Sequence, residues 1–233
     1  MFRRCCATFA APSAEQQKLV SKIKLLGDPA LRHRPNKITH CGAPAVKAAA
    51  RELYATLEAF RAVKGFGRAI AANQIGLDYR MIAIHINKPV ILCNPTIYDA
   101  SFEKHTLWDD CFSHPNLMVR VTRHKIISVK AEVLKNWQEE GNHQTDDPAA
   151  DEVQLVDLSA SESELLQHEI DHLDGLTSLD RLVPKEMHPK SPALHVESVI
   201  EREEYLNNKA RYEAMVDFTG KDCPMSESAQ KYL

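Results

Sequence analysis

The stretch "LLQHEIDHLDG", Leu165–Gly175, carries two histidines four residues apart, with a glutamate directly after the first. On a helix, side chains four positions apart lie on the same face, one above the other. His168 and His172 can therefore direct two imidazoles toward one point, where a divalent metal would bind. Leucine and isoleucine residues flank the pair, so its face is expected to be buried, and buried imidazoles need polar partners.

The residues around this stretch predict where its helix begins and ends. Ser159 and Ser161 offer N-caps, and Ser161–Glu164 has the spelling of a capping box. Gly175 is a normal C-terminal stop. The pattern therefore predicts a single amphipathic helix with both histidines in its second half.

A catalytic metal site needs three protein ligands and one open position for water. The metal lowers the pKa of that water to roughly 7 from 15.7, and Glu169 is placed to take its proton. The helix supplies two ligands, so the third must come from another part of the chain. In the metzincin pattern it would be a third histidine, but Ser178 stands there, and Glu186 lies beyond Pro184 in a linker.

Upstream, "LWDDCFSHP" offers Cys111 between acidic and aromatic residues. A thiolate is a strong ligand for zinc or iron(II). Most lone cysteines are small buried hydrophobic residues, so the sequence around Cys111 leaves both interpretations open.

The order of the predicted elements indicates an α+β fold. An amphipathic helix is predicted over Ala43–Val63, ending at Gly65 and Gly67. Short strands follow, in the sequences "YRMIAIHI", "PVILCNPTIY", "RHKIISVKAEVL" and "EVQLVDLSAS". A second charged helix is predicted over Val196–Val216. We expect mostly antiparallel short strands packed around a central metal-binding helix, with an N-terminal helix and a C-terminal helical extension.

Three stretches together resemble the signature motifs of the peptide deformylase family. "GRAIAANQIG", Gly67–Gly76, is similar to the first motif, "DDCFS", Asp109–Ser113, to the second, and "QHEIDHLDG", Gln167–Gly175, to the third. "LLGDPALR", Leu25–Arg32, resembles the N-terminal segment of the family. The resemblance covers roughly Lys22 to Val183.

The resemblance implies an amide hydrolase that removes the formyl group from N-terminal formylmethionine of nascent polypeptides. It implies iron(II), Fe2+, as cofactor, with zinc, Zn2+, or another divalent metal as the alternative. The site residues that it implies are the metal ligands Cys111, His168 and His172, the general acid/base Glu169, the oxyanion donors Gln74 (side-chain amide) and Phe112 (backbone N–H), and the substrate-binding residues Gly67, Ala69 and Ile70.

The chain departs from the family motifs at several positions near the predicted site. Asp109 stands in place of glutamate, Asp110 in place of glycine, and Ala69 in place of the second glycine of the first motif. Ser161 and Glu164 precede His168 by about two turns and one turn, where a methionine pocket would be apolar. Alternatives are therefore a metallohydrolase of the same fold with another amide substrate, or a catalytically impaired binding protein. An H-E-x-x-H zinc protease is disfavoured by Ser178.

Two arginines follow the cysteine motif. Either Arg120 or Arg123 pairs with Asp109 and fixes the loop that carries Cys111, or both are solvated at the entrance of a strand.

The overall composition limits the partners and the compartment. A net charge of −3 gives no electrostatic reason to expect nucleic acid or a membrane as partner. The partners expected are formylmethionyl peptides and ribosome-associated nascent chains. The six scattered cysteines are interpreted as reduced thiols.

The domain organisation follows from the same observations. Residues 1–20 are interpreted as a targeting or flexible segment, because "MFRRCCATFAAPSAEQQ" is basic and free of acids until Glu15, which favours a mitochondrial location over a cytoplasmic one. Residues 21–185 are predicted to form the catalytic domain, and residues 186–233 the C-terminal helical extension.

Overall fold

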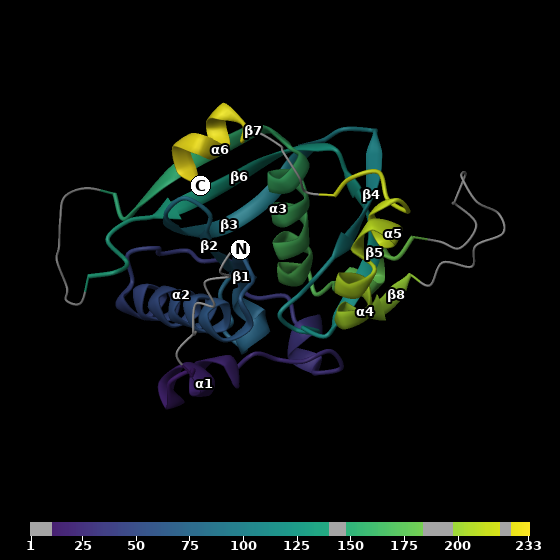
Figure 1. The fold of residues 1–233 in the computed structure, drawn as a ribbon. Helices are drawn as coiled ribbons and strands as arrows, with labels where there is room; N and C mark the ends of the chain where they lie inside the picture. The colour runs from purple at the N-terminus through teal and green to yellow at the C-terminus, as the bar shows by residue number, and fades with distance from the viewer. Residues whose placement is uncertain (1–10, 140–147, 184–197, 220–224) are drawn as a thin grey trace, which may run out of the picture.

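The computed structural model describes residues 11–139, 148–183, 198–219 and 225–233. It confirms the α+β fold, with antiparallel strand pairs throughout the two sheets of the described residues (Figure 1). The helices are α1 (Ala14–Val20), α2 (Pro44–Lys64), α3 (Ala160–Leu173), α4 (Arg202–Asn207), α5 (Lys209–Glu213) and α6 (Glu227–Tyr232), with short 3-10 turns at Pro29–Arg32, Ala72–Ile75 and Ser178–Arg181.

The strands form a larger and a smaller sheet, with α3 between them (Figure 1). The larger sheet has the order β1-β2-β3-β6-β7 and the smaller β4-β5-β8. Their bounds are β1 (Ala69–Ala71), β2 (Met81–His85), β3 (Pro89–Ala100), β4 (Lys104–Asp109), β5 (Leu117–His124), β6 (Ile126–Leu134), β7 (Ala150–Ser159) and β8 (Val199–Glu201).

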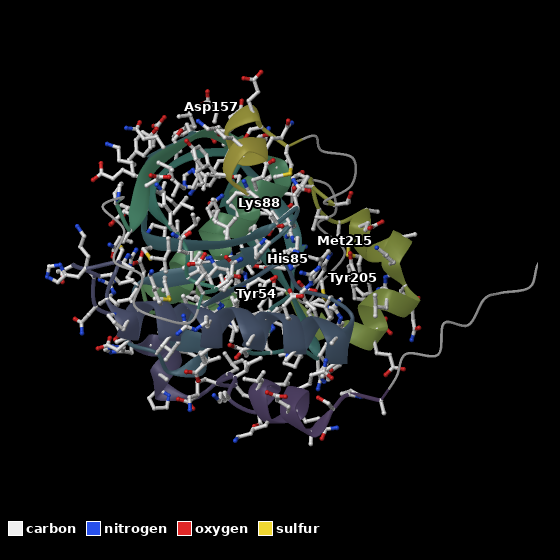
Figure 2. The ribbon with its side chains drawn as sticks, turned by 90° about the vertical axis from the view of Figure 1, so that its left-hand side faces the viewer. Tyr54, His85, Lys88, Asp157, Tyr205 and Met215 are labelled. Atoms are coloured by element: carbon white, nitrogen blue, oxygen red, sulfur yellow. The ribbon has the colours of Figure 1, made fainter. Side chains whose placement is uncertain are left out.

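Helix α2 covers one face of the larger sheet. Its apolar residues at spacings of three and four are buried, among them Leu53, Leu57 and Phe60. The helix ends at Gly65, whose φ of 76° lets its N–H reach the carbonyl of Arg61. On the same helix, Tyr54 Oη lies 2.8 Å from His85 Nδ1 of β2, which ties α2 to the sheet (Figure 2).

Helix α3 is buried on nearly all sides because both sheets pack against it. Leu166, Ile170 and Leu173 join the core that it shares with β2, β3 and β6. His168 and His172 are not part of this apolar core, but both are buried as well. The N-cap is Ser159, whose N–H donates to Glu162 Oε2 at 3.3 Å, so the capping box begins two residues earlier than Ser161.

The prediction of one helix over Val196–Val216 was wrong. Residues Val199–Glu201 pair with β5 as strand β8, and two short helices, α4 and α5, follow, separated at Asn208. Residues 196 and 197 lie outside the described residues. Pairing with β5 outweighs the helical preference of the charged sequence. The free side of β5 offers backbone N–H and C=O groups, and the hydrogen bonds of β8 satisfy them.

Two strands of the smaller sheet were not predicted. Lys104–Asp109 and Leu117–His124 pair as β4 and β5, so Arg123 and His124 belong to β5 and not to the strand that follows.

Several sequence predictions fall on other parts of the chain. Residues 1–10, half of the predicted targeting segment, lie outside the described residues, whereas Ala14–Val20 forms α1 beside α2 (Figure 1). Cys41, Cys93 and Cys111 are buried free thiols, as predicted, and Cys5, Cys6 and Cys223 fall outside the described residues. Across the described part of the chain, every helix is too short or too polar to cross a membrane.

We expect Gly175→Ala to destabilise the fold through the turn that ends α3. Gly175 has φ of 73°, and a Cβ there would lie 2.6 Å from the backbone oxygen of Arg32. The left-handed conformation alone costs roughly 1–2 kcal/mol for alanine, and the clash adds to it. Thermal unfolding should show a fall in Tm of about 2–4 °C for each kcal/mol lost.

The matched control is Gly27→Ala. Gly27 has φ of 102°, but a Cβ at this position would meet no atom within 4 Å, so only the backbone conformation is penalised. Equal Tm changes in the two variants would contradict the close approach of Arg32 as a cause.

Candidate metal centre

Helix α3 brings its two histidines together as the spacing predicts. His168 Nε2 and His172 Nε2 lie 3.2 Å apart, and the two rings are tilted by 75° with centroids 4.8 Å apart. Both residues are buried. The two nitrogens therefore present a paired donor set at one point on the helix surface.

Cys111 completes a group of three ligand atoms. It follows the end of β4, and its Sγ lies 3.2 Å from His172 Nε2. The Sγ atom and the two histidine nitrogens all lie within 4.8 Å of one another, and all three residues are buried. One soft sulfur and two imidazoles form a donor set that suits zinc or iron(II), so the prediction of a metal site is confirmed.

Asp109 orients the first histidine. His168 Nδ1 donates to Asp109 Oδ2 at 2.9 Å, which leaves Nε2 free to face the metal position. Arg123 Nη2 donates to the same oxygen at 2.9 Å, and Ser178 Oγ does so at 3.3 Å. Burial opposes ionisation of Asp109, but the charges of His168 and Arg123 outweigh it and hold the pKa of this carboxyl well below its usual range.

Arg123 links the metal centre to the end of α3. Its Nη1 donates to Asp171 Oδ2 at 2.7 Å, and Arg181 holds the same carboxylate with contacts of 3.0 and 2.6 Å. The pairing of one arginine with Asp109 is thereby confirmed for Arg123. Arg120 is also buried, with 3% of its surface exposed, so neither arginine is solvated.

Gln74 contacts the loop that carries Cys111. Its Nε2 donates to Ser113 Oγ at 3.1 Å and lies 3.4 Å from Cys111 Sγ. Its Oε1 accepts from the backbone N–H of Ala71 at 2.9 Å, which fixes the orientation of the amide. The amide N–H group therefore points toward the metal centre.

The Phe112 ring is held by close packing. It stacks on Phe60 with ring centroids 3.7 Å apart. A Cβ at Gly67 would lie 2.2 Å from the Phe112 ring, so only glycine fits against it. This contact joins the loop of the first motif to the loop of the second.

Glu169 lies beside the first histidine and is 3% exposed. Its Oε2 has no hydrogen-bond partner among the described residues. Burial raises the pKa of Glu169 to about 7, with a smaller opposing effect from the charge of His168. Such a carboxyl can hold or release a proton near neutral pH.

A cavity of about 390 Å³ opens onto the metal centre. Cys111, His168, Glu169 and Gln74 line it, as do Gly67 and Ala69 from the first motif. The Ile70 side chain instead lies in the core between α2 and the larger sheet.

The acidic residues that depart from the family motifs are paired with arginines. Glu164 forms an ion pair with Arg68, which also donates to the backbone oxygen of Ser161 at 3.3 Å. Asp110 forms an ion pair with Arg202 of α4. These carboxylates therefore lie at the cavity with their charges compensated. The sequence did not reveal the two arginine partners. Arg68 lies 96 positions from Glu164 and Arg202 lies 92 positions from Asp110, so each pair comes together only through the fold.

Comparison with known proteins places this site in a family. The sequence model described as "Polypeptide deformylase" matches residues 20–188. The chain is 34% identical over 164 residues to a peptide deformylase of Natranaerobius thermophilus, covering 70% of this chain and 92% of that protein. It is 31% identical to a peptide deformylase of Dictyoglomus thermophilum, covering 71% and 94%.

Solved structures agree with these relatives. The crystal structure of peptide deformylase from Thermotoga maritima superposes with a TM-score of 0.57 at 28% identity, covering 70% of this chain and 97% of that one. A peptide deformylase from Synechococcus elongatus in complex with actinonin shares the fold, with a TM-score of 0.56 at 21% identity, covering 70% and 79%.

We expect Arg123→Met to weaken both the fold and the metal site. The change leaves Asp109 without its arginine in a buried position, and breaking a buried pair in this way costs about 3–5 kcal/mol. Loss of a residue that orients a ligand typically weakens metal binding about 10–100-fold. Urea unfolding measures the first effect, and competition with a chelator measures the second.

Arg61→Met is the matched control for the buried arginine. Arg61 pairs with Glu58 one helical turn away, and both side chains are about one-third exposed or more. We expect its removal to change the free energy of unfolding by no more than about 0.5 kcal/mol. Similar losses in both variants would show that Arg123 does not act through the buried pair.

Proposed function

The chain belongs to the polypeptide deformylase family, and we propose that it removes the formyl group from the N-terminal formylmethionine of nascent polypeptides. The observation that carries this proposal is the buried group of Cys111, His168 and His172 with Glu169 at the same cavity. A metal-dependent hydrolase needs these parts together, namely three ligands, an acid/base and room for a substrate.

For the metal, we propose iron(II), with zinc or another divalent ion as the alternative. The single thiolate and two imidazoles accept either ion. When bound, such a metal acts as a Lewis acid and makes water nucleophilic near neutral pH. The protein contributes the fixed geometry, because Asp109 orients the ring of His168 and the Gln74 amide is directed toward the cysteine loop.

Glu169 is proposed to move the protons of the reaction. Its carboxylate would take a proton from the attacking water and then deliver it to the departing amine nitrogen. Two observations support this role: the Oε2 atom has no partner among the described residues, and the pKa is raised to about 7. A group with a pKa near the working pH serves well in both directions.

Gln74 and Phe112 are proposed to stabilise the negative oxygen of the tetrahedral intermediate. The Gln74 Nε2 donor is fixed by the bond between its Oε1 atom and Ala71 N–H, so it needs no reorganisation during the reaction. The backbone N–H of Phe112 would be the second donor, next to Cys111.

The substrate backbone is proposed to run along the first motif. Strand β1 is an edge of the larger sheet, and Gly67 and Ala69 line the cavity beside it. An extended peptide can bind such an edge through backbone hydrogen bonds. Ile70 would take part through its backbone, because its side chain is fully buried in the core.

We further propose that the substrates are nascent chains near the ribosome, and that the protein works in mitochondria and not in the cytoplasm. The second proposal rests on the basic, acid-free start of residues 1–14. Residues 1–20 fused to a fluorescent protein should direct it to mitochondria, and diffuse cytoplasmic fluorescence would reject that location.

The test of the function is a formate-release assay on protein purified without oxygen. N-formylmethionyl peptides should release formate, whereas N-acetylmethionyl peptides of the same sequence should release no acetate. Stoichiometric metal without formate release would instead favour another amide substrate.

We expect Glu169→Gln to lower kcat by about 10²–10⁴-fold, because the amide keeps the shape of the side chain but cannot exchange protons. The metal content should stay at the wild-type level, since the three ligands are untouched. Metal analysis beside the kinetics separates the two effects, and a variant with near wild-type kcat would rule out the acid/base role.

Cys111→Ala should remove the metal and lower the thermal stability of the purified protein. Metal binding stabilises the folded state, so losing a ligand removes that contribution. Cys93→Ala is the control, because Cys93 is a buried thiol in the core between α2 and the larger sheet and does not belong to the group of three ligands. Equal metal content in both variants would exclude Cys111 as a ligand.

A further inference from the structure

The segment Val199–Phe218 follows the residues that the family model matches. It begins with β8, a strand of the smaller sheet, and the rest of the segment packs against that sheet. In Figure 1, α4 and α5 lie against β4 and β5. In Figure 2, Tyr205 and Met215 lie on the side of these helices that faces the rest of the domain, where both pack against the cluster around Trp108. We call this segment the C-terminal wall.

Alternate positions along β4 and just past its end hold the C-terminal wall. Thr106 N–H and Oγ1 donate to Asp217 Oδ2 at 3.1 and 2.9 Å. Trp108 Nε1 donates to the backbone oxygen of Tyr212 at 2.9 Å, and Asp110 pairs with Arg202. Alternate residues of a strand share a face, so these contacts run along one side of the strand that leads to Cys111.

The C-terminal wall reaches the catalytic cavity at several side chains. Tyr205, Val216 and Phe218 line the cavity together with Leu107 and Trp108 of β4. These five side chains form a mainly apolar and aromatic surface. Glu213 of α5 and Thr219, directly after the C-terminal wall, line the cavity as well, and Glu213 forms an ion pair with Lys209 at 3.7 Å. Phe218 is further fixed by stacking on His105, with ring centroids 4.9 Å apart.

The side of the cavity formed by α3 is mainly polar, with Leu165 as its apolar residue. Ser161 and Glu164 line it, and Glu164 is occupied by Arg68. An apolar substrate side chain would desolvate this ion pair if it bound there, which is unfavourable. The apolar surface of the C-terminal wall is the better partner for hydrocarbon.

We propose that the C-terminal wall, through Val216 and Phe218, selects the side chain of the first substrate residue and favours large apolar side chains. This inference rests on the proposed function, which places the formyl group at the metal centre. The cavity of about 390 Å³ opens to both the metal ligands and the wall, so one residue can span them. Asp110 then has a structural role, since it anchors the wall through Arg202.

Two substitutions of opposite size at one position test the proposal. Val216→Phe narrows the space at the wall, and the ratio of kcat/KM for formyl-Met over formyl-Ala peptides should fall about tenfold or more, in line with the effect of pocket size on apolar side chains. Val216→Ala widens the space at the wall, and the ratio of kcat/KM for formyl-Phe over formyl-Met peptides should rise several-fold. Phe218→Leu is a second variant that should lower the formyl-Met preference.

Leu206→Ala is the matched control, because Leu206 belongs to the same segment but is 55% exposed and does not line the catalytic cavity. Its selectivity should equal that of the wild type. Metal content and thermal unfolding show whether each variant is folded. One folded variant, at either Val216 or Phe218, is sufficient to test the proposal.

The outcomes separate this inference from the function beneath it. Wild-type protein that releases formate, with folded Val216 and Phe218 variants that keep the wild-type selectivity within about twofold, would overturn the role of the wall alone. Wild-type protein that releases no formate from any formyl peptide would overturn the proposed function and this inference with it. Opposite shifts in the two Val216 variants support both.

Discussion

A single carboxylate oxygen, Oδ2 of Asp109, gathers the elements that build the metal centre. It accepts hydrogen bonds from His168 Nδ1 on α3, from Arg123 Nη2 on β5 and from Ser178 Oγ on the turn after α3. A buried carboxylate is tolerated only when it is paired and hydrogen-bonded, so these partners are required to assemble together. Their assembly leaves His168 Nε2 directed at the metal position and places Cys111, two residues after Asp109, beside His172. The shorter aspartate in place of the family's glutamate still reaches both the histidine and the arginine.

The other acidic departures from the family follow the same rule. Glu164 and Asp110 add negative charge at the cavity, and each is matched by an arginine from a distant part of the chain, Arg68 and Arg202. Arg202 also lies over the Phe66 ring at 3.7 Å, which places its charge at the cavity rim against an aromatic face. Arg68 lowers the pKa of Glu169 and Glu164 raises it, so the two charges of this pair act on the neighbouring carboxyl in opposite directions. The acidic departures therefore add little net charge to the cavity.

Local sequence signals predicted the elements whose structure is decided locally. Capping residues, the four-residue histidine spacing and the apolar period placed α2 and α3. Short runs of β-type residues placed β2, β3 and β7, and alternation in the second half of its predicted segment placed β6. The sequence "KHTLWD" of β4 carries no such pattern, because one of its faces is covered by a segment about 100 residues away. The prediction of one C-terminal helix was wrong for a related reason. Its charged residues favour a helix, yet Val199–Glu201 pairs with β5 and Asn208 interrupts the rest. The three metal ligands could be predicted because they lie in short sequence motifs. The arginine partners and the cavity wall could not, because they arise only from long-range packing.

The C-terminal wall also covers the exposed edge of β4. β4 is one of the two edge strands of the smaller sheet, and an open edge exposes backbone groups that can pair with other chains. At Thr106 the backbone N–H donates to Asp217 Oδ2, and the backbone oxygen accepts from the N–H groups of Asp217 and Phe218 at 3.0 and 3.1 Å. The same crossing carries Phe218 onto the His105 side of the strand and Val216 to the cavity. The same contacts thus protect the edge of the sheet and form part of the cavity surface. The backbone contacts at Thr106 hold Asp217 and Phe218 in place, and they thereby fix Val216 and Phe218 where both side chains line the cavity.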